Sequence, residues 1–164
     1  MSKLTEIAEQ LKEEAPATRK MLERVPDDKL DWKPHEKSMT LGRLSGLCAD
    51  MFGWFSFMIG EPELDFAKNY AYPQDMKAKD MVEFLDKRLE ESLDVIEKKD
   101  DRVLDEDWKM RRGEQIFMET TKGKVSRQTL CHLAHHRGQL SVYLRLLDIP
   151  VPSIYGPSAD EGQM

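Results

Sequence analysis

Apolar residues recur every three or four positions along four long stretches of the chain, the spacing that is typical of amphipathic helices. These stretches predict helices over about 2–25, 40–59, 77–98 and 126–148. Pro16 lies inside the first stretch, and its missing N–H predicts a kink or a restart there. Four long helices, joined by loops longer than a minimal bundle needs, predict an all-α antiparallel four-helix bundle.

The segments between the predicted helices are rich in proline and charge. Residues 26–39 and 61–75 are predicted to be loops. Between 100 and 124 the pattern changes, because two stretches of partial alternation flank Gly113 and Glu114. This pattern predicts a short β-hairpin before the last helix. Two prolines end that helix, and the tail beyond them is predicted to be irregular.

Length and composition indicate a globular protein with one domain, residues 1–164. The chain is 40% hydrophobic and 34% charged, which is enough for a core without a disulfide. Its net charge is −6, and lysine and arginine are spread among acids, so no nucleic-acid partner is predicted. Cys48 and Cys131 form no CxxC pair and are interpreted as buried thiols. With no signal-peptide pattern and no membrane-length apolar stretch, we expect a cytoplasmic protein without a membrane partner.

The second predicted helix is apolar around more than half of its circumference. Its side chains include Phe52 and Trp54, which one neighbouring helix would not cover. A homodimer is therefore predicted, in which a second copy covers the remaining apolar surface.

The last predicted helix contains three of the four histidines within five residues. His132, His136, Gln139 and Tyr143 fall within about 60° on a helical wheel and border the apolar face, whereas His135 points outward. Two imidazoles at i and i+4 can bind one divalent ion if another element provides a third ligand. The same residues could equally be interior polar groups bonded to one another or to loop backbone. GxSxG, P-loop and GxGxxG motifs are absent, so this stripe is the leading candidate site.

Two segments resemble one known family. "HHRGQLSVYLRLLDIPVPSIYGPSADE", residues 135–161, resembles the C-terminal signature of the DinB family, the DinB/YfiT-like bundles. "TRKMLERVPDDKLDWKPHEKSMTLGRL", residues 18–44, resembles the first helix, first loop and start of the second helix of that family. The resemblance implies an up-down-down-up bundle that is often dimeric. It also implies a three-histidine metal site in many members and, in some, transferase or isomerase activity with low-molecular-weight thiols.

Carried over residue by residue, the resemblance places two metal ligands at His132 and His136. The family's second-helix histidine aligns with Leu47, in "LGRLSGLCADM", and leucine cannot ligate a metal. Three residues are candidates to replace the missing ligand: Asp50, which is nearest in direction on the wheel, Cys48 and His35. Asp50 has the alternative interpretation of a surface or helix-capping acid.

Two functions from different classes remain open. The first is a metal-dependent enzyme of the thiol S-transferase or hydrolase type, in which a zinc or nickel ion on His132 and His136 lowers the pKa of a bound thiol or water. The second is a non-catalytic, dimeric or small-molecule-binding bundle without metal, which the apolar Leu47 favours.

Overall fold

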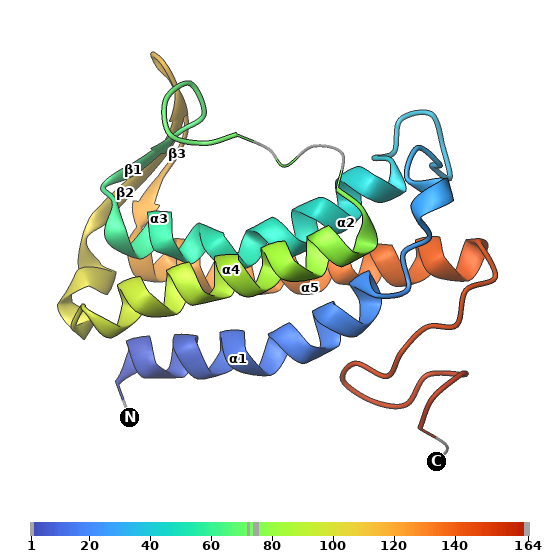
Figure 1. Cartoon of the computed structure of the whole chain (residues 1–164). Helices are drawn as coiled ribbons and strands as arrows, with labels where there is room; N and C mark the ends of the chain where they lie inside the picture. Colours follow the sequence, from blue (N-terminus) through green and yellow to red (C-terminus); the bar gives the residue numbers. More distant parts are fainter. Residues whose placement is uncertain (1, 72, 74–75, 163–164) are drawn as a thin grey trace.

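The four predicted helices are present in the computed structural model, which describes residues 2–71, 73 and 76–162. Its helices are α1 (Lys3–Leu22), α2 (Leu41–Asp50), α3 (Trp54–Gly60), α4 (Ala78–Glu97) and α5 (Lys122–Leu146), with 3-10 turns at Asp27–Lys29, Met51–Gly53 and Asp101–Asp105. α1 and α5 run in one direction, whereas α2, α3 and α4 run in the other (Figure 1). The up-down-down-up order is therefore confirmed.

The second helix of the bundle consists of α2 and α3 joined by one 3-10 turn, Met51–Gly53. Ser92 of α4 stabilises this turn, because its hydroxyl donates to the Phe52 carbonyl at 2.6 Å and accepts from the Ser56 N–H at 3.1 Å. The prediction of one helix over 40–59 has the right ends and misses the break. Gly53 lies at the break, where a Cβ would be only 2.0 Å from Nε of Arg88.

Gly53→Ala is expected to lower the free energy of unfolding by about 1–3 kcal/mol, the usual cost of overpacking a filled space. The added methyl would force Arg88 away from Asp50, which its Nε contacts at 3.1 Å. Urea denaturation measures the loss. Gly46→Ala is the matched control, because a Cβ there meets its nearest atom at an ordinary 3.5 Å. Equal effects of the two substitutions would contradict the close approach of Arg88.

A three-stranded sheet lies at one end of the bundle (Figure 1). β2 (Asp107–Arg112) pairs antiparallel with β3 (Gln115–Thr121), and Gly113 in the turn has a positive φ of 55°. The predicted hairpin is therefore confirmed. β1 (Glu63–Asp65) pairs parallel with β2, so the prediction that 61–75 is only loop is wrong at these residues. Three residues are too short a strand to show the alternation on which strand prediction depends.

Of the two outcomes predicted at Pro16, the restart is wrong, because α1 runs from Lys3 to Leu22 through the exposed proline. The predicted start of α5 also needs correction. α5 begins at Lys122, four residues before the predicted start. The Thr121 hydroxyl caps it by accepting from the Lys124 N–H, and the buried Lys122 ammonium donates to the Ile59 carbonyl at 3.2 Å. The local cap and the tertiary contact of Lys122 together fix the start of α5, and neither is part of the apolar pattern.

The two aromatic residues behind the homodimer prediction are largely covered within the chain. Phe52 has no exposed surface, and Trp54 is half-buried with Tyr70 against its ring at 6.3 Å. The argument from the second helix is therefore wrong, although the homodimer itself stays a prediction. In the described part of the chain, no helix is both long and apolar enough to cross a membrane.

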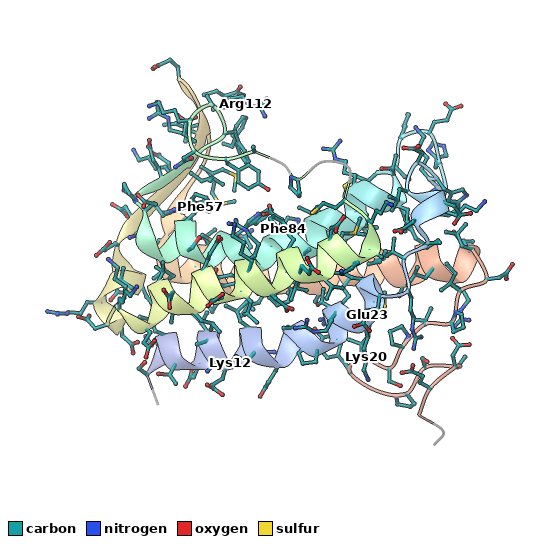
Figure 2. The ribbon with its side chains drawn as sticks, in the orientation of Figure 1. Lys12, Lys20, Glu23, Phe57, Phe84 and Arg112 are labelled. Carbon is teal, nitrogen blue, oxygen red and sulfur yellow. The ribbon has the colours of Figure 1, made fainter. Side chains whose placement is uncertain are left out.

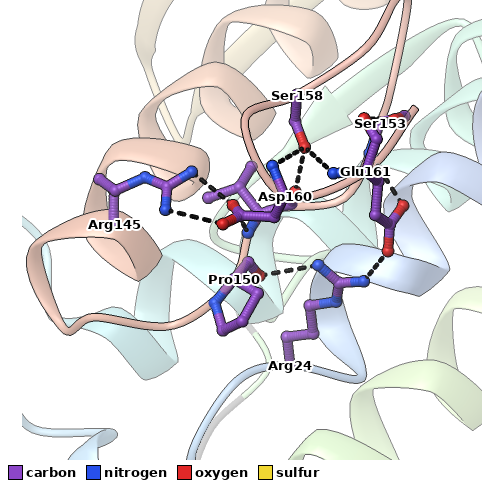
Figure 3. Close-up of polar contacts among 8 residues, drawn as sticks. Arg24, Arg145, Pro150, Ser153, Ser158, Asp160 and Glu161 are labelled. Carbon is purple, nitrogen blue, oxygen red and sulfur yellow. Dashed lines mark hydrogen bonds and ion pairs between the residues drawn. The ribbon is translucent and has the colours of Figure 1, made fainter. Parts of the chain in front are cut away.

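The C-terminal tail is irregular, as predicted, yet polar contacts fasten it to the bundle (Figure 3). Arg24 donates to the Pro150 carbonyl at 2.8 Å and pairs with Glu161. Arg145 of α5 pairs with Asp160 at 2.5 Å. The tail is thus held against the ends of two helices.

Candidate functional site

The predicted histidine stripe brings three side chains together on α5. Nε2 of His132 and Nε2 of His136 lie 2.7 Å apart, and Nδ1 of His136 lies 2.7 Å from Oε1 of Gln139. An amide oxygen only accepts, so Nδ1 of His136 carries the hydrogen, and its Nε2 accepts a hydrogen bond from Nε2 of His132. Tyr143 is outside this cluster, because its hydroxyl donates to the Met39 carbonyl at 3.2 Å.

Both histidines are biased toward the neutral form. Burial lowers the pKa of His132 below its ordinary 6.5, and the nearby His136 and His135 lower it further. Burial also lowers the pKa of His136, although the hydrogen bond to Gln139 partly opposes this effect. The neutral imidazole is the form that ligates a metal or accepts a proton.

Acidification is expected to destabilise the fold through this histidine pair. Since both folded-state pKa values lie below 6.5, the unfolded chain binds protons first as the pH falls. Stability should therefore decrease as the pH drops through about 6.5 and level off below the lowered pKa values. Urea denaturation at a series of pH values should show a shallower loss for the His132→Gln/His136→Gln double variant. If the stability of the double variant fell with pH as steeply as that of the parent, the lowered pKa values of the two histidines would be contradicted.

A cleft of about 690 Å³ opens beside His132. Its walls come from the first loop, α2, the start of α3, the segment before α4, and α5. Both apolar and charged side chains line the cleft. The apolar and aromatic ones are Leu30, Met39, Leu47, Trp54, Pro73 and Met76, and the charged ones are Asp27, Asp28, Asp31, Arg43 and Lys77. Leu47 is half-buried and lines the same cleft as His132, so the residue aligned with the missing ligand does face the histidine side.

Asp50 has a role different from the predicted metal ligand. It is 2% exposed and accepts from Nε1 of Trp54 at 2.8 Å and from the Tyr70 hydroxyl. Arg88 contacts its other oxygen at 3.1 Å. The Trp54 ring in turn lies 5.8 Å from the His132 ring. Asp50 therefore positions Trp54, the aromatic wall beside the histidines.

Arg88 of α4 completes this arrangement, and its side chain lies between α3 and α4. Its guanidinium lies 5.6 Å from the ring of Phe57 on α3 and 5.8 Å from the ring of Phe84 on α4. Figure 2 labels both rings. Arg88 is thus held by two aromatic faces as well as by Asp50, the carboxylate that also accepts from Trp54.

The other candidate ligands are also placed elsewhere. Cys48 is fully buried, and burial raises the pKa of its thiol to about 12, so it stays protonated. His35 is exposed in the first loop, where its Nδ1 accepts from the Lys37 N–H at 3.2 Å. Cys131 is exposed, which corrects the interpretation of both cysteines as buried.

Two of the three ligands expected for a metal site are suitably arranged. Two nitrogens bound tetrahedrally to one zinc ion at 2.0–2.1 Å are about 3.3 Å apart, so the imidazoles would need to separate slightly, and the hydrogen on Nε2 of His132 would need to move to its Nδ1. Within residues 2–71, 73 and 76–162, no cluster of three or more His, Cys, Asp or Glu side chains could hold a metal ion. A metal ion on His132 and His136 would therefore need a third donor from outside this set.

A buried ion pair next to the site was not predicted. Arg137 is 1% exposed and pairs with Glu14 of α1, and it also donates to the Thr18 hydroxyl at 3.0 Å and to the Tyr155 hydroxyl at 2.5 Å. The sequence did indicate that Arg137 is buried, because it lies only about 50° from the centre of the apolar arc of its helix. This network joins α1, α5 and the tail behind the histidines.

Comparison with known proteins finds similarity to one family in both sequence and structure. A family model described as the DinB family matches residues 1–163. The uncharacterised protein YrdA of Bacillus subtilis is 27% identical over 150 residues, which cover 90% of this chain and 85% of YrdA. The crystal structure of a DinB-like protein, YjoA of Bacillus subtilis, has a TM-score of 0.71 at 20% identity and covers 91% of this chain and 97% of its own. A DinB-like protein from Bacillus cereus has a TM-score of 0.66 at 20% identity, with 91% and 95% covered.

Proposed function

Because this chain belongs to the DinB family, we propose that it binds a divalent ion, zinc or nickel, on His132 and His136 and acts on a small molecule in the adjoining cleft. The observation that carries this proposal is the pair of Nε2 atoms that face each other at 2.7 Å beside a cleft of about 690 Å³. Gln139 supports the same role, since metal-binding histidines usually donate their other N–H to an acceptor that orients the ring.

The cleft gives the proposed substrate its environment. Its volume suits a small organic molecule rather than a macromolecule. Trp54 and Leu47 give the cleft apolar surface next to His132, where the reacting group would lie. A divalent ion there would lower the pKa of a thiol or a water that binds it. With only two ligands from the chain, the small molecule itself would provide a further donor, as a low-molecular-weight thiol can.

Zinc titration of protein purified without an affinity tag tests the proposal, with a chromophoric chelator as competitor. We expect one ion per chain, and loss of binding in His132→Ala and in His136→Ala. His135→Ala is the matched control, because this histidine is adjacent but exposed, and it should bind as the parent does. Absence of binding, or equal binding by all four proteins, would contradict a metal site here.

A second candidate function is supported by Leu47. An apolar residue on the cleft wall, in place of the family's third ligand, suits a protein that binds a small molecule without metal. The neutral histidine pair would then act as a hydrogen-bonding group for that molecule. The same titration distinguishes the two functions, since this candidate predicts no stoichiometric zinc in the parent.

A further inference from the structure

The cleft beside His132 has two ends with different surroundings. Gly42 near the start of α2 and Trp54 at the start of α3 both line it, and they are 12 residues apart on two helices that lie in line (Figure 1). At 1.5 Å per helical residue, this separation is about 18 Å. A Cβ on Gly42 would be 3.2 Å from Cβ of Leu30, so the first loop lies at the Gly42 end, whereas the His132 ring lies 5.8 Å from the Trp54 ring. We call these the loop end and the histidine end of the cleft.

Five charged side chains of the described chain line the cleft, and all of them lie at its loop end. They are Asp27, Asp28 and Asp31 of the first loop, Arg43, which follows Gly42, and Lys77. The Ala78 N–H donates to Oδ1 of Asp27 at 2.9 Å, and this bond holds Lys77, the residue before Ala78, beside the first loop. At the histidine end, His132 is biased toward the neutral form. The cleft therefore offers acids and bases together at one end only.

The acids and the bases of the loop end do not neutralise one another. Within residues 2–71, 73 and 76–162, no ion pair joins an acid of this end to either base. Asp28 pairs with Lys29 at 3.8 Å, but both side chains are more than half exposed, so this pair is weak. Elsewhere on the surface, opposite charges do pair across elements, as Arg145 and Asp160 do. Both signs of charge are therefore open to a bound molecule.

An apolar stretch of wall joins the two ends of the cleft. Gly46, one turn after Gly42, lies across from Met76 and Pro73, since a Cβ on Gly46 would be 3.5 Å and 3.7 Å from them. Leu47 follows on α2 and lines the same wall. Apolar atoms of a ligand that cover these side chains would be removed from water, which favours binding. A molecule that fills the cleft is therefore long, with a charged head at the loop end and an apolar body that points toward the histidines.

We propose that the substrate of this cleft is an elongated molecule with a zwitterionic head of the α-amino-acid type, whose ammonium binds the acids of the loop end and whose carboxylate binds Arg43 and Lys77. This inference rests on the proposed function, in which the cleft takes a small molecule. Contacts of a carboxylate with an ammonium or a guanidinium are charge-assisted hydrogen bonds, which are about twice as strong as neutral ones. A head with a single charge would lie beside side chains of its own sign, which repel it. The two charges together therefore select the ligand.

Three matched ligands test the head group: 2-aminooctanoic acid, its amide, which lacks the carboxylate, and its N-acetyl derivative, which lacks the ammonium. NMR of isotope-labelled, tag-free protein in EDTA follows the indole N–H of Trp54, which lines the cleft. Trp108, which is 1% exposed and outside this cleft, is the internal control. We expect 2-aminooctanoic acid to shift the Trp54 signal and to bind at least about tenfold more tightly than either derivative. An equal or higher affinity for either derivative, or no binding of 2-aminooctanoic acid at about 2 mM, overturns the proposal.

Two double variants assign each charge of the head group to its partners. Asp28→Asn/Asp31→Asn should remove the advantage of 2-aminooctanoic acid over the N-acetyl derivative and keep its advantage over the amide. Arg43→Gln/Lys77→Gln should do the reverse, because it removes the partners of the carboxylate. If either variant kept both advantages, or lost both, the assignment of the two charges would be contradicted.

A third double variant controls for the change in net charge. Asp94→Asn/Glu97→Gln removes two exposed acids of α4 that do not line the cleft. It should bind all three ligands as the parent does. If it lost the preference for the ammonium as fully as Asp28→Asn/Asp31→Asn, the preference would come from overall charge and the proposal would be wrong.

These ligand measurements are separate from the zinc titration, because EDTA removes divalent ions. If zinc bound His132 and His136 but 2-aminooctanoic acid did not bind, the zwitterionic head would be overturned and the metal site would stand. If 2-aminooctanoic acid bound with the expected preference and zinc did not bind, the head group would be supported and the metal-dependent function would fail.

Discussion

Arg137→Met is expected to lower the free energy of unfolding by about 3–5 kcal/mol, the cost of removing one partner from a buried ion pair. Arg137 is 1% exposed and Glu14 is 8% exposed. Arg137 also donates to the Glu14 carbonyl and to the Thr18 hydroxyl, so the substitution leaves three acceptors on α1 without this donor. Most of the loss comes from the carboxylate of Glu14, which remains buried without its counter-charge.

Denaturation of matched variants separates the buried pair from an ordinary surface pair. Arg145→Met removes a similar pair with Asp160, but these side chains are 48% and 26% exposed, so we expect a loss of less than about 1 kcal/mol. The Glu14→Gln/Arg137→Met double variant should recover part of the stability, because it removes both charges. If Arg137→Met and Arg145→Met were equally mild, the network around Arg137 would not hold α1 to α5.

Leu47→His is expected to raise the affinity for zinc by about a hundredfold or more, because it adds a third ligand to a pair that is already arranged for chelation. Leu47 and His132 line the same cleft, and Leu47 is half-buried on α2. The new imidazole would therefore project toward Nε2 of His132 and His136. Competition titration against a chelator of known affinity measures the change.

Two further variants control for effects other than ligation. Leu47→Asn introduces a polar group of similar size without an imidazole, and we expect no such gain. Leu47→His/His136→Ala has two histidines again, and its affinity should return to about that of the parent. An unchanged affinity in Leu47→His would mean that position 47 does not face the histidine pair.

The four helices could be predicted because each buries one long stripe of apolar residues. The sequence prediction missed two smaller features, β1 and the break in the second helix. β1 is a strand of three residues, and the break in the second helix depends on Ser92 and Arg88 of another helix. No local pattern contains this information, since the partners are far away in sequence.

The candidate site was predictable where its parts share one helix. His132, His136 and Gln139 meet on α5 because positions three and four apart face each other. Asp50 was left open between a metal ligand and a surface or capping acid, and its buried contacts were not foreseen, because its partners Tyr70 and Arg88 lie on other segments. The ion pair of Arg137 with Glu14 joins residues 123 positions apart, a contact that only the tertiary structure reveals.

The most direct measurement of the proposed metal site is the number of imidazole ligands per zinc ion, determined by X-ray absorption spectroscopy on tag-free protein. We predict two imidazoles on zinc in the parent, at about 2.0–2.1 Å, and three in Leu47→His. A zinc spectrum without imidazole ligands, or one that His136→Ala leaves unchanged, would contradict a metal site on His132 and His136.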